Sequence, residues 1–135
     1  MSTYHFSGGH IEKANEFIMR VTFNVEKDIS VEHIKEIKAI REQLFGDNYY
    51  CSIIDVTKDF MGISEEAKKY VTQHPEVNRF RVAEAMLVKN LGQKLGVDVY
   101  IRLSKPTRVT KAFLKEEKAK KWLKAEFDKF NSTPN

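Results

Sequence analysis

The chain has 135 residues, of which 41% are hydrophobic and 31% charged, and this composition is ordinary for a single globular domain. A chain of this length can bury a core without metals or disulfides, and its composition predicts a folded protein with disorder only at the ends. The single cysteine excludes an internal disulfide, and no apolar stretch approaches the ~20 residues that span a bilayer. The N-terminus has no signal-peptide pattern, so we expect a cytoplasmic protein without membrane insertion.

The formal net charge of +4 is unevenly distributed along the chain. Residues 105–130 contain nine Lys or Arg and four Asp or Glu, a balance of +5, whereas the rest of the chain has a balance of −1. Such an excess of positive charge either attracts an anionic partner or belongs to a helix face that is exposed to water. Glu116 lies four residues before Lys120, in the favourable order for an ion pair along a helix, so a solvated face explains part of the charge.

Residues 1–16 are expected to form an N-terminal strand or extension. Tyr4–Phe6 has the composition of a short strand, and Gly8 with Gly9 is a turn signal that returns the chain through Ile11. Residues 17–24 alternate between apolar and polar side chains, which predicts a strand with one buried face.

A helix is predicted between Ser30 and Gly46. The Ser30 hydroxyl can cap the free N–H groups of the first turn, and Gly46 suits the position just after the last turn. The apolar stripe expected to face the sheet is Val31, Ile34, Ile37, Ile40, Leu44 and Phe45, whereas Glu36, Lys38, Arg41 and Glu42 are expected to face water.

Further strands are predicted at residues 49–56 and 82–88, which are rich in β-branched and other apolar side chains. Between them, Ser64 caps a second helix that ends near Pro75. Residues 90–95 predict a short helix that is ended by Gly96, and residues 97–103 predict a fourth strand.

Residues 109–113 predict a short edge strand, and residues 115–130 predict a last helix. Residues 131–135 are expected to be a disordered tail. Because strand and helix patterns alternate, we expect an α/β fold in one domain over residues 1–130. Its sheet should be mostly parallel or mixed, with four to five strands and alternating helices.

Three segments resemble a known family: Ser-Ile-Ile-Asp-Val (52–56), Val-Ala-Glu-Ala-Met-Leu-Val (82–88), and the ending from Pro106 through Phe113 to Trp122. They resemble the STAS-like (SpoIIAA-like) domains, and most closely a group of small stand-alone bacterial proteins without an assigned function. The resemblance implies the fold of bacterial anti-sigma-factor antagonists and of the cytoplasmic domains of sulfate transporters.

In the anti-sigma-factor antagonists, a strand ending in Asp is followed by an Asp-Ser-Ser-Gly motif, one serine of which is phosphorylated by a partner kinase. Here the strand ends at Asp55, the motif is absent, and Ser64 or Glu65 falls at about the phosphoserine position. Ser64 is therefore either a phosphorylation site or a helix cap. The adjacent Glu65 and Glu66 favour the cap, because they would repel a phosphate.

Two places are candidates for binding a ligand or an anion. Asp55 lies at a strand end, where open α/β sheets place ligands, although its carboxylate would equally suit loop N–H groups. The second place is a helix start directly after a strand, where an anion or a simple cap by the asparagine side chain would fit. Its residues, with the cations expected nearby, are Lys89, Asn90, Gly92, Arg102, Lys105 and Arg108.

No catalytic pattern stands out in the sequence. Glu84 interrupts an apolar strand and, if buried, would need a partner such as Arg81 or Arg102. The histidines have no metal-ligand spacing with one another or with Cys51, which we expect to be a buried hydrophobe. We therefore expect no metal and no cofactor, and the sequence gives no support for an enzyme.

Three functions remain open. The first is a non-catalytic interaction or regulatory domain, a homodimer with a possible protein partner. The second is a small-ligand binding protein that holds a lipid or a nucleotide between helix and sheet. The third is nucleic-acid binding through the basic C-terminal helix, which is disfavoured because the aromatic side chains there lie on the inward stripe.

Overall fold

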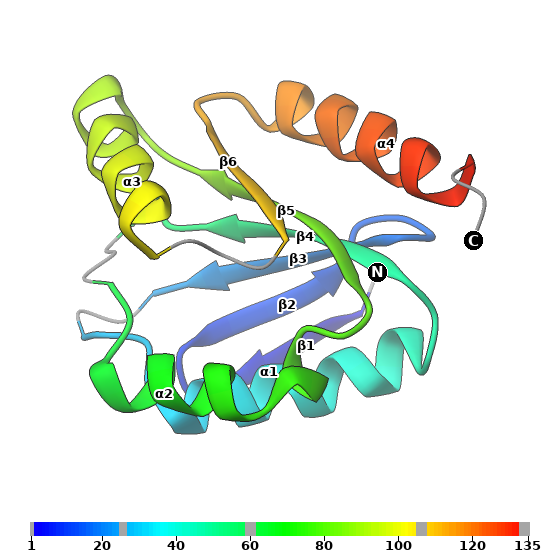
Figure 1. The fold of residues 1–135 in the computed structure, drawn as a ribbon, viewed down its shortest axis with the longest axis horizontal. Helices are drawn as coiled ribbons and strands as arrows, with labels where there is room; N and C mark the ends of the chain where they lie inside the picture. Colours follow the sequence, from blue (N-terminus) through cyan, green and yellow to red (C-terminus); the bar gives the residue numbers. More distant parts are fainter. Residues whose placement is uncertain (1, 25–26, 59–61, 105–107, 133–135) are drawn as a thin grey trace.

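The computed structural model describes residues 2–24, 27–58, 62–104 and 108–132 (Figure 1). The elements follow in the order β1 (Thr3–Phe6), β2 (Gly9–Lys13), β3 (Ile18–Phe23), α1 (Val31–Phe45), β4 (Tyr50–Asp55), α2 (Glu65–Gln73), a 3-10 turn (Pro75–Val77), β5 (Arg81–Leu87), α3 (Leu91–Ser104), β6 (Val109–Phe113) and α4 (Glu116–Ser132). No helix among the described residues is long and apolar enough to cross a membrane.

The described strands form one six-stranded mixed sheet in the order β1-β2-β3-β4-β5-β6. The first three strands pair antiparallel, and β3 to β6 pair parallel. The expectation of a mixed α/β sheet with alternating helices is confirmed, with a strand count above the expected four to five. The N-terminal hairpin accounts for the difference, since both of its strands join the sheet.

The helices cover the two faces of the sheet unequally. Each parallel strand lies beside the next one in sequence, so right-handed crossovers place α1, α2 and α3 on the same face. Two clusters on that face, one under α1 and one under α3, share Ile54 of β4. The last helix, α4, covers the opposite face, where Leu123 and Ala119 pack on Ile53 and Ala85. Figure 1 shows α4 on the other side of the sheet from α1 and α2.

The predicted start and end of the first helix are confirmed. The Ser30 hydroxyl accepts a hydrogen bond of 3.2 Å from the backbone N–H of His33, and the His33 ring accepts one of 3.1 Å from the backbone N–H of Ser30. Gly46 follows the last turn at a φ of 59°, a left-handed value that favours glycine. Ser64 likewise caps α2, and Pro75 follows its end.

The prediction for residues 90–103 is wrong. One continuous helix, α3, replaces the short helix and the fourth strand. The β-branched residues Val97, Val99 and Ile101 suggested a strand, but only Val97 and Ile101 pack under the helix, four residues apart. Gly96 lies inside the helix and does not end it. Lys94 and Asp98 form an ion pair of 3.0 Å across one turn, as helical spacing requires.

At the C-terminus, α4 continues to Ser132, so the first two residues of the expected tail are helical. Residues 133–135 lie outside the described part of the chain. The expected inward stripe is confirmed, because Phe127 stacks on Phe17 with ring centroids 4.5 Å apart and Trp122 lies against Phe113.

Candidate functional site

A large groove opens between the sheet and the three helices on the α1 face, and we call it the helix-face groove. Its volume is about 1050 Å³. The floor is formed by the sheet, chiefly by Met19, Tyr50, Ser52, Ile54, Glu84 and Met86, and the walls by α1, α2 and α3. Ile54 is only partly buried although it lies in a central strand, whereas the adjacent Ile53 is fully buried under α4. Met19, Tyr50 and Met86 are at most 5% exposed, so the helical layer leaves a gap chiefly over Ile54.

The groove exists because α2 does not pack closely on the sheet. This helix lies against α1 and buries only Ala67. On the other side, α3 packs mainly on β6 at the edge of the sheet. The strands β4 and β5 lie between these two supports, so their side chains are left to line a groove.

Most of the groove wall is apolar. Ile34 and Ile37 line it from α1, Val71 from α2 and Ile101 from α3, while Met86 contributes from the floor. Small-molecule sites are typically concave, mostly apolar and roughly 300–1,000 Å³ in volume, with a few polar groups that fix orientation. The helix-face groove has the size and the lining of such a site.

The polar groups of the floor form one connected cluster. Arg81 donates a hydrogen bond of 3.1 Å to Glu84 Oε1, and the Ser52 hydroxyl donates one of 3.2 Å to the same oxygen. Arg81 and Glu84 are three residues apart on one strand but share a face, because a register shift opposite Tyr50 and Ser52 places an additional residue in β5. The expectation that Glu84 pairs with Arg81 is confirmed.

Arg41 completes the polar part of the groove, and here the sequence interpretation is wrong. This arginine was expected to face water from α1, but it is only 4% exposed. Its guanidinium lies 5.8 Å from the ring centroids of both Tyr50 and Phe80 and donates a hydrogen bond of 3.0 Å to the carbonyl of Gly46. Contact with two aromatic rings and a carbonyl accounts for its burial. The charge of the side chain suggested the surface, whereas its helical position, one turn from both Ile37 and Phe45, places it on the buried face.

The model of the family described as Domain of unknown function (DUF7793) matches residues 11–126. The chain belongs to this family. The match covers all of the described elements except β1 and the ends of β2 and α4. No curated protein matches the chain.

A solved structure places this DUF7793 domain in a known fold. It is the crystal structure of an uncharacterized protein of the DUF3478 family with a SpoIIAA-like fold from Shewanella loihica PV-4. The match covers 84% of this chain and 90% of that chain, with 15% sequence identity and a TM-score of 0.55. At this identity the likeness shows the fold alone, and it confirms the SpoIIAA-like resemblance.

Asp55, a predicted ligand residue, lies on the α4 face of the sheet, away from the groove. Its Oδ2 accepts a hydrogen bond of 2.9 Å from Arg20, and its Oδ1 accepts bonds from the amide and hydroxyl of Thr57 at 2.9 and 2.6 Å. Arg20 also binds Glu116 at the start of α4, at 2.9 and 3.1 Å. The carboxylate thus helps to join β3, β4 and α4.

The charges of this group shift one another's pKa. Burial alone would raise the pKa of Asp55, but hydrogen bonds from Thr57 and Arg20 outweigh it, and the pKa is lowered. The hydrogen bond to Arg20 lowers the pKa of Glu116, and the same bond raises the pKa of Arg20. Such mutual stabilisation of charges is typical of a structural ion-pair network.

Ser64 occupies the cap of α2. Its hydroxyl accepts a hydrogen bond of 3.1 Å from the backbone N–H of Ala67. The cap and the phosphorylation site proposed from the sequence are the same hydroxyl, so a phosphate there would displace this bond. Phosphorylation of Ser64 stays a prediction.

The residues of the second predicted anion site are not all brought together. Asn90 caps α3 through a bond of 2.8 Å from the amide of Gln93, and the amide of Lys89 donates one of 2.7 Å to the Gln93 side chain. Gly92 lies in the first turn of α3 and Arg102 in the last, which places them about 15 Å apart at 1.5 Å per residue. Arg108 precedes β6 and lines the groove, and Lys105 lies outside the described residues.

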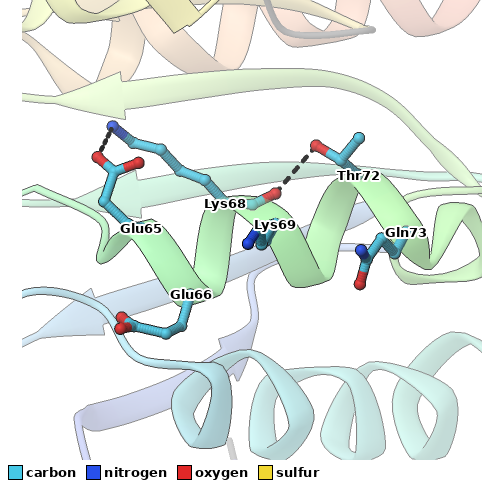
Figure 2. A pocket seen from close by; sticks show the side chains of 6 residues that line it. All are labelled: Glu65, Glu66, Lys68, Lys69, Thr72 and Gln73. Carbon is cyan, nitrogen blue, oxygen red and sulfur yellow. Dashed lines mark hydrogen bonds and ion pairs between the residues drawn. The ribbon is translucent and has the colours of Figure 1, made fainter.

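A smaller depression of about 470 Å³ is lined by α2, and it shares Lys68 and Thr72 with the groove. Figure 2 shows that all six of its side chains come from this one helix, and that Lys68 is turned toward Glu65, with which it pairs at 3.2 Å. A surface formed by one helix and bridged by its own ion pair has no converging polar groups, so it offers less of a site than the groove.

Metal and thiol chemistry find little support in the described part of the chain. It contains no group of three or more His, Cys, Asp or Glu side chains placed to hold a metal ion. Cys51 is fully buried beneath α4, and burial raises the pKa of its thiol to about 12. A thiol with so high a pKa is a poor nucleophile at neutral pH.

Proposed function

We propose that this DUF7793 domain binds a small, largely apolar ligand in the helix-face groove. The observation that carries the proposal is the groove itself, about 1050 Å³ in volume, which leaves Ile54 partly uncovered in a central strand. The partly exposed side chains of Ile54, Val71 and Ile101 present apolar area to water, and a bound ligand would remove that area from water at roughly 25 cal/mol per Å². Of the ligand classes considered from the sequence, a lipid-like molecule fits these walls better than a nucleotide.

Filling the groove should weaken ligand binding without unfolding the protein. Replacing Ile54 with tryptophan places a large ring over the floor between α2 and α3. We expect the affinity for the neutral fluorescent dye Nile red to fall at least about tenfold, because the ring occupies volume that the dye would take. Forcing extra groups into a filled apolar space typically costs roughly 1–3 kcal/mol.

The matched control is Leu114→Trp, at an exposed position outside the groove, which should leave dye binding unchanged. Circular dichroism of both variants reports whether the fold is kept. Wild-type protein that does not enhance Nile red fluorescence, or an Ile54→Trp variant that binds the dye as well as the wild type, would contradict the proposal.

A second function, self-association, is favoured by one specific surface. The outward face of α3 carries four exposed apolar residues at intervals of four, Leu91, Leu95, Val99 and Leu103, and the last of these also lines the groove. Successive members are offset by about 40° around the helix, so all four fall within about 120°. Exposed apolar patches of this kind often mark interaction surfaces.

The spacing of this stripe suits a second copy of the same chain. A two-fold axis near the middle of α3 would place Leu91 opposite the partner's Leu103 and Leu95 opposite the partner's Val99, as an isologous interface requires. The flank of the stripe carries both Lys94 and Asp98, so two copies would not repel each other. We infer that the protein forms homodimers through α3.

Light scattering coupled to size exclusion tests the dimer. Wild-type protein should have a mass twice that of the 15.7 kDa chain. Leu95→Lys should be monomeric, because each introduced ammonium group would be buried without a counter-charge opposite the partner's Val99. Leu95 is 67% exposed in the single chain, so the substitution should not disturb folding. A monomeric wild type, or a variant that remains dimeric, would exclude this interface.

A further inference from the structure

Two buried arginine atoms on the helix-face groove have no hydrogen-bond partner. They are the Nε groups of Arg41 and Arg81, the only such side-chain atoms among the described residues. Buried polar groups are nearly always paired, so each exception calls for an explanation. Both arginines line the groove, one from α1 and one from β5.

The two guanidinium groups are held in place by their other contacts. Arg41 is fixed by the carbonyl of Gly46 and by the rings of Tyr50 and Phe80, and Arg81 by the carboxylate of Glu84. Both cations also lower the pKa of Tyr50, although burial, the largest influence, raises it overall. The Arg41 guanidinium lies 5.8 Å from the centroid of the Tyr50 ring, and Arg81 is the register partner of Tyr50 on the neighbouring strand, so both residues are close to Tyr50 at the floor of the groove.

The groove lining carries an excess of positive charge, although Lys38 and Lys68 pair with Glu42 and Glu65 just outside it. Among the described residues that line it, six are basic and one, Glu84, is acidic. The basic residues are Lys38, Arg41, Lys68, Arg79, Arg81 and Arg108. A concave surface with one sign of charge and low-dielectric walls concentrates the opposite charge. The remaining lining is mostly apolar, so the complementary molecule has an apolar body and an anionic end.

We propose that the floor of the groove is a subsite for the anionic head of an amphipathic ligand, a carboxylate or a phosphate monoester, held by Arg41 and Arg81 while the apolar chain lies along Ile54 and Met86. This inference rests on the proposed function, since it assigns the polar end of the ligand that the groove binds. Arginine suits this role because its planar fork of donors matches carboxylate and phosphate oxygens. Glu84 keeps Arg81 oriented in the absence of ligand.

The test displaces Nile red, which is uncharged, with three ten-carbon competitors: decanol, decanoate and decyl phosphate. In the wild type, we expect the two anions to displace the dye at concentrations at least about tenfold lower than decanol does. The reason is that a hydrogen bond between two charged groups is stronger than one between a charged group and a neutral hydroxyl. In Arg41→Met and in the double variant Arg81→Gln/Glu84→Gln, the anions should displace the dye only at concentrations close to that required for decanol. Exposed Arg102, which does not line the groove, supplies the control variant Arg102→Gln.

Glu84→Gln separates a role in the subsite from a purely structural role. The substitution keeps an acceptor for Ser52 but removes the one negative charge of the lining. Anion affinity should rise several-fold, by removal of like-charge repulsion, while the affinity for decanol stays constant. A structural role alone would change stability and leave the ratio between competitors unaltered.

The outcomes distinguish the two proposals. Wild-type protein that binds Nile red but does not discriminate decanol from the anions would overturn the subsite and leave the groove as a ligand site. Protein that binds neither the dye nor any competitor would overturn both proposals. In a separate calorimetric titration, inorganic phosphate that binds as tightly as decyl phosphate would show that the site takes a free anion, which would overturn the amphipathic assignment.

Discussion

Replacing Leu123 with alanine is expected to lower the free energy of unfolding by about 3 kcal/mol. Leu123 is fully buried at the centre of the contact between α4 and the sheet, among Ile18, Cys51 and Ile53. Truncation removes apolar contacts and leaves a cavity that the close-packed strands cannot fill. Urea denaturation followed by circular dichroism measures the change. The exposed Leu114→Ala should change stability by less than about 0.5 kcal/mol.

Cys51 gives this variant an independent readout. The thiol lies beneath α4, with its Sγ 3.9 Å from the carbonyl of Leu123, and is fully buried. A thiol reagent should therefore label wild-type protein slowly and Leu123→Ala faster, because local opening of α4 becomes easier. A variant that loses less than about 1 kcal/mol and keeps its thiol protected would contradict the packing of α4 described above.

Replacing Arg20 with methionine is expected to lower the free energy of unfolding by about 2 kcal/mol at pH 7, below the value for a fully buried pair because these groups retain some solvent contact. The substitution keeps the apolar stem but leaves Asp55 and Glu116 without their shared cation. Arg102→Met, at an exposed position, is the matched control and should be nearly neutral. Equal stability of the wild type and Arg20→Met at pH 7 would mean that the network contributes nothing.

The loss of unfolding free energy caused by Arg20→Met should become smaller as the pH falls. The pKa values of Asp55 and Glu116 are lowered in the folded protein, so their stabilising effect is present above the unfolded values of about 4 and is lost as the pH falls through the folded values. The difference in stability between wild type and variant should therefore be largest above about pH 5 and shrink on acidification. A difference that grows below pH 4 would contradict the assigned role.

The sequence predicted the fold well where local signals agreed with tertiary packing. Ser30, Gly46 and Ser64 mark helix ends through hydrogen bonds to nearby backbone, so they can be recognised without knowing the rest of the structure. The alternation of strands and helices was sufficient to predict a mixed α/β sheet. Around Val97 and Ile101 the signals conflicted, since β-branched residues favour strands while their spacing of four places both under a helix.

The candidate site was harder to predict than the fold, because the groove depends on which part of the sheet the helices do not cover. No pattern within α2 indicates that this helix packs on α1 and leaves the sheet open. Arg41 lies on the same helix face as Ile34 and Phe45, but an arginine there is expected to face water, and its burial requires Tyr50 and Phe80 from two other segments. Only Glu84 gave a usable signal, as a carboxylate in an apolar strand with an arginine close by in sequence.

The most direct test of the account is an NMR titration of ¹⁵N-labelled protein with decyl phosphate. We predict that amide shifts concentrate on the residues around the helix-face groove, in particular Ile54, Val71, Arg81, Met86 and Ile101, and leave most of α4 unchanged. Ile54→Trp should lose these shifts. Changes confined to α4 or to the outward face of α3, or no changes at all at millimolar ligand, would contradict the proposal that the groove is the binding site of this domain.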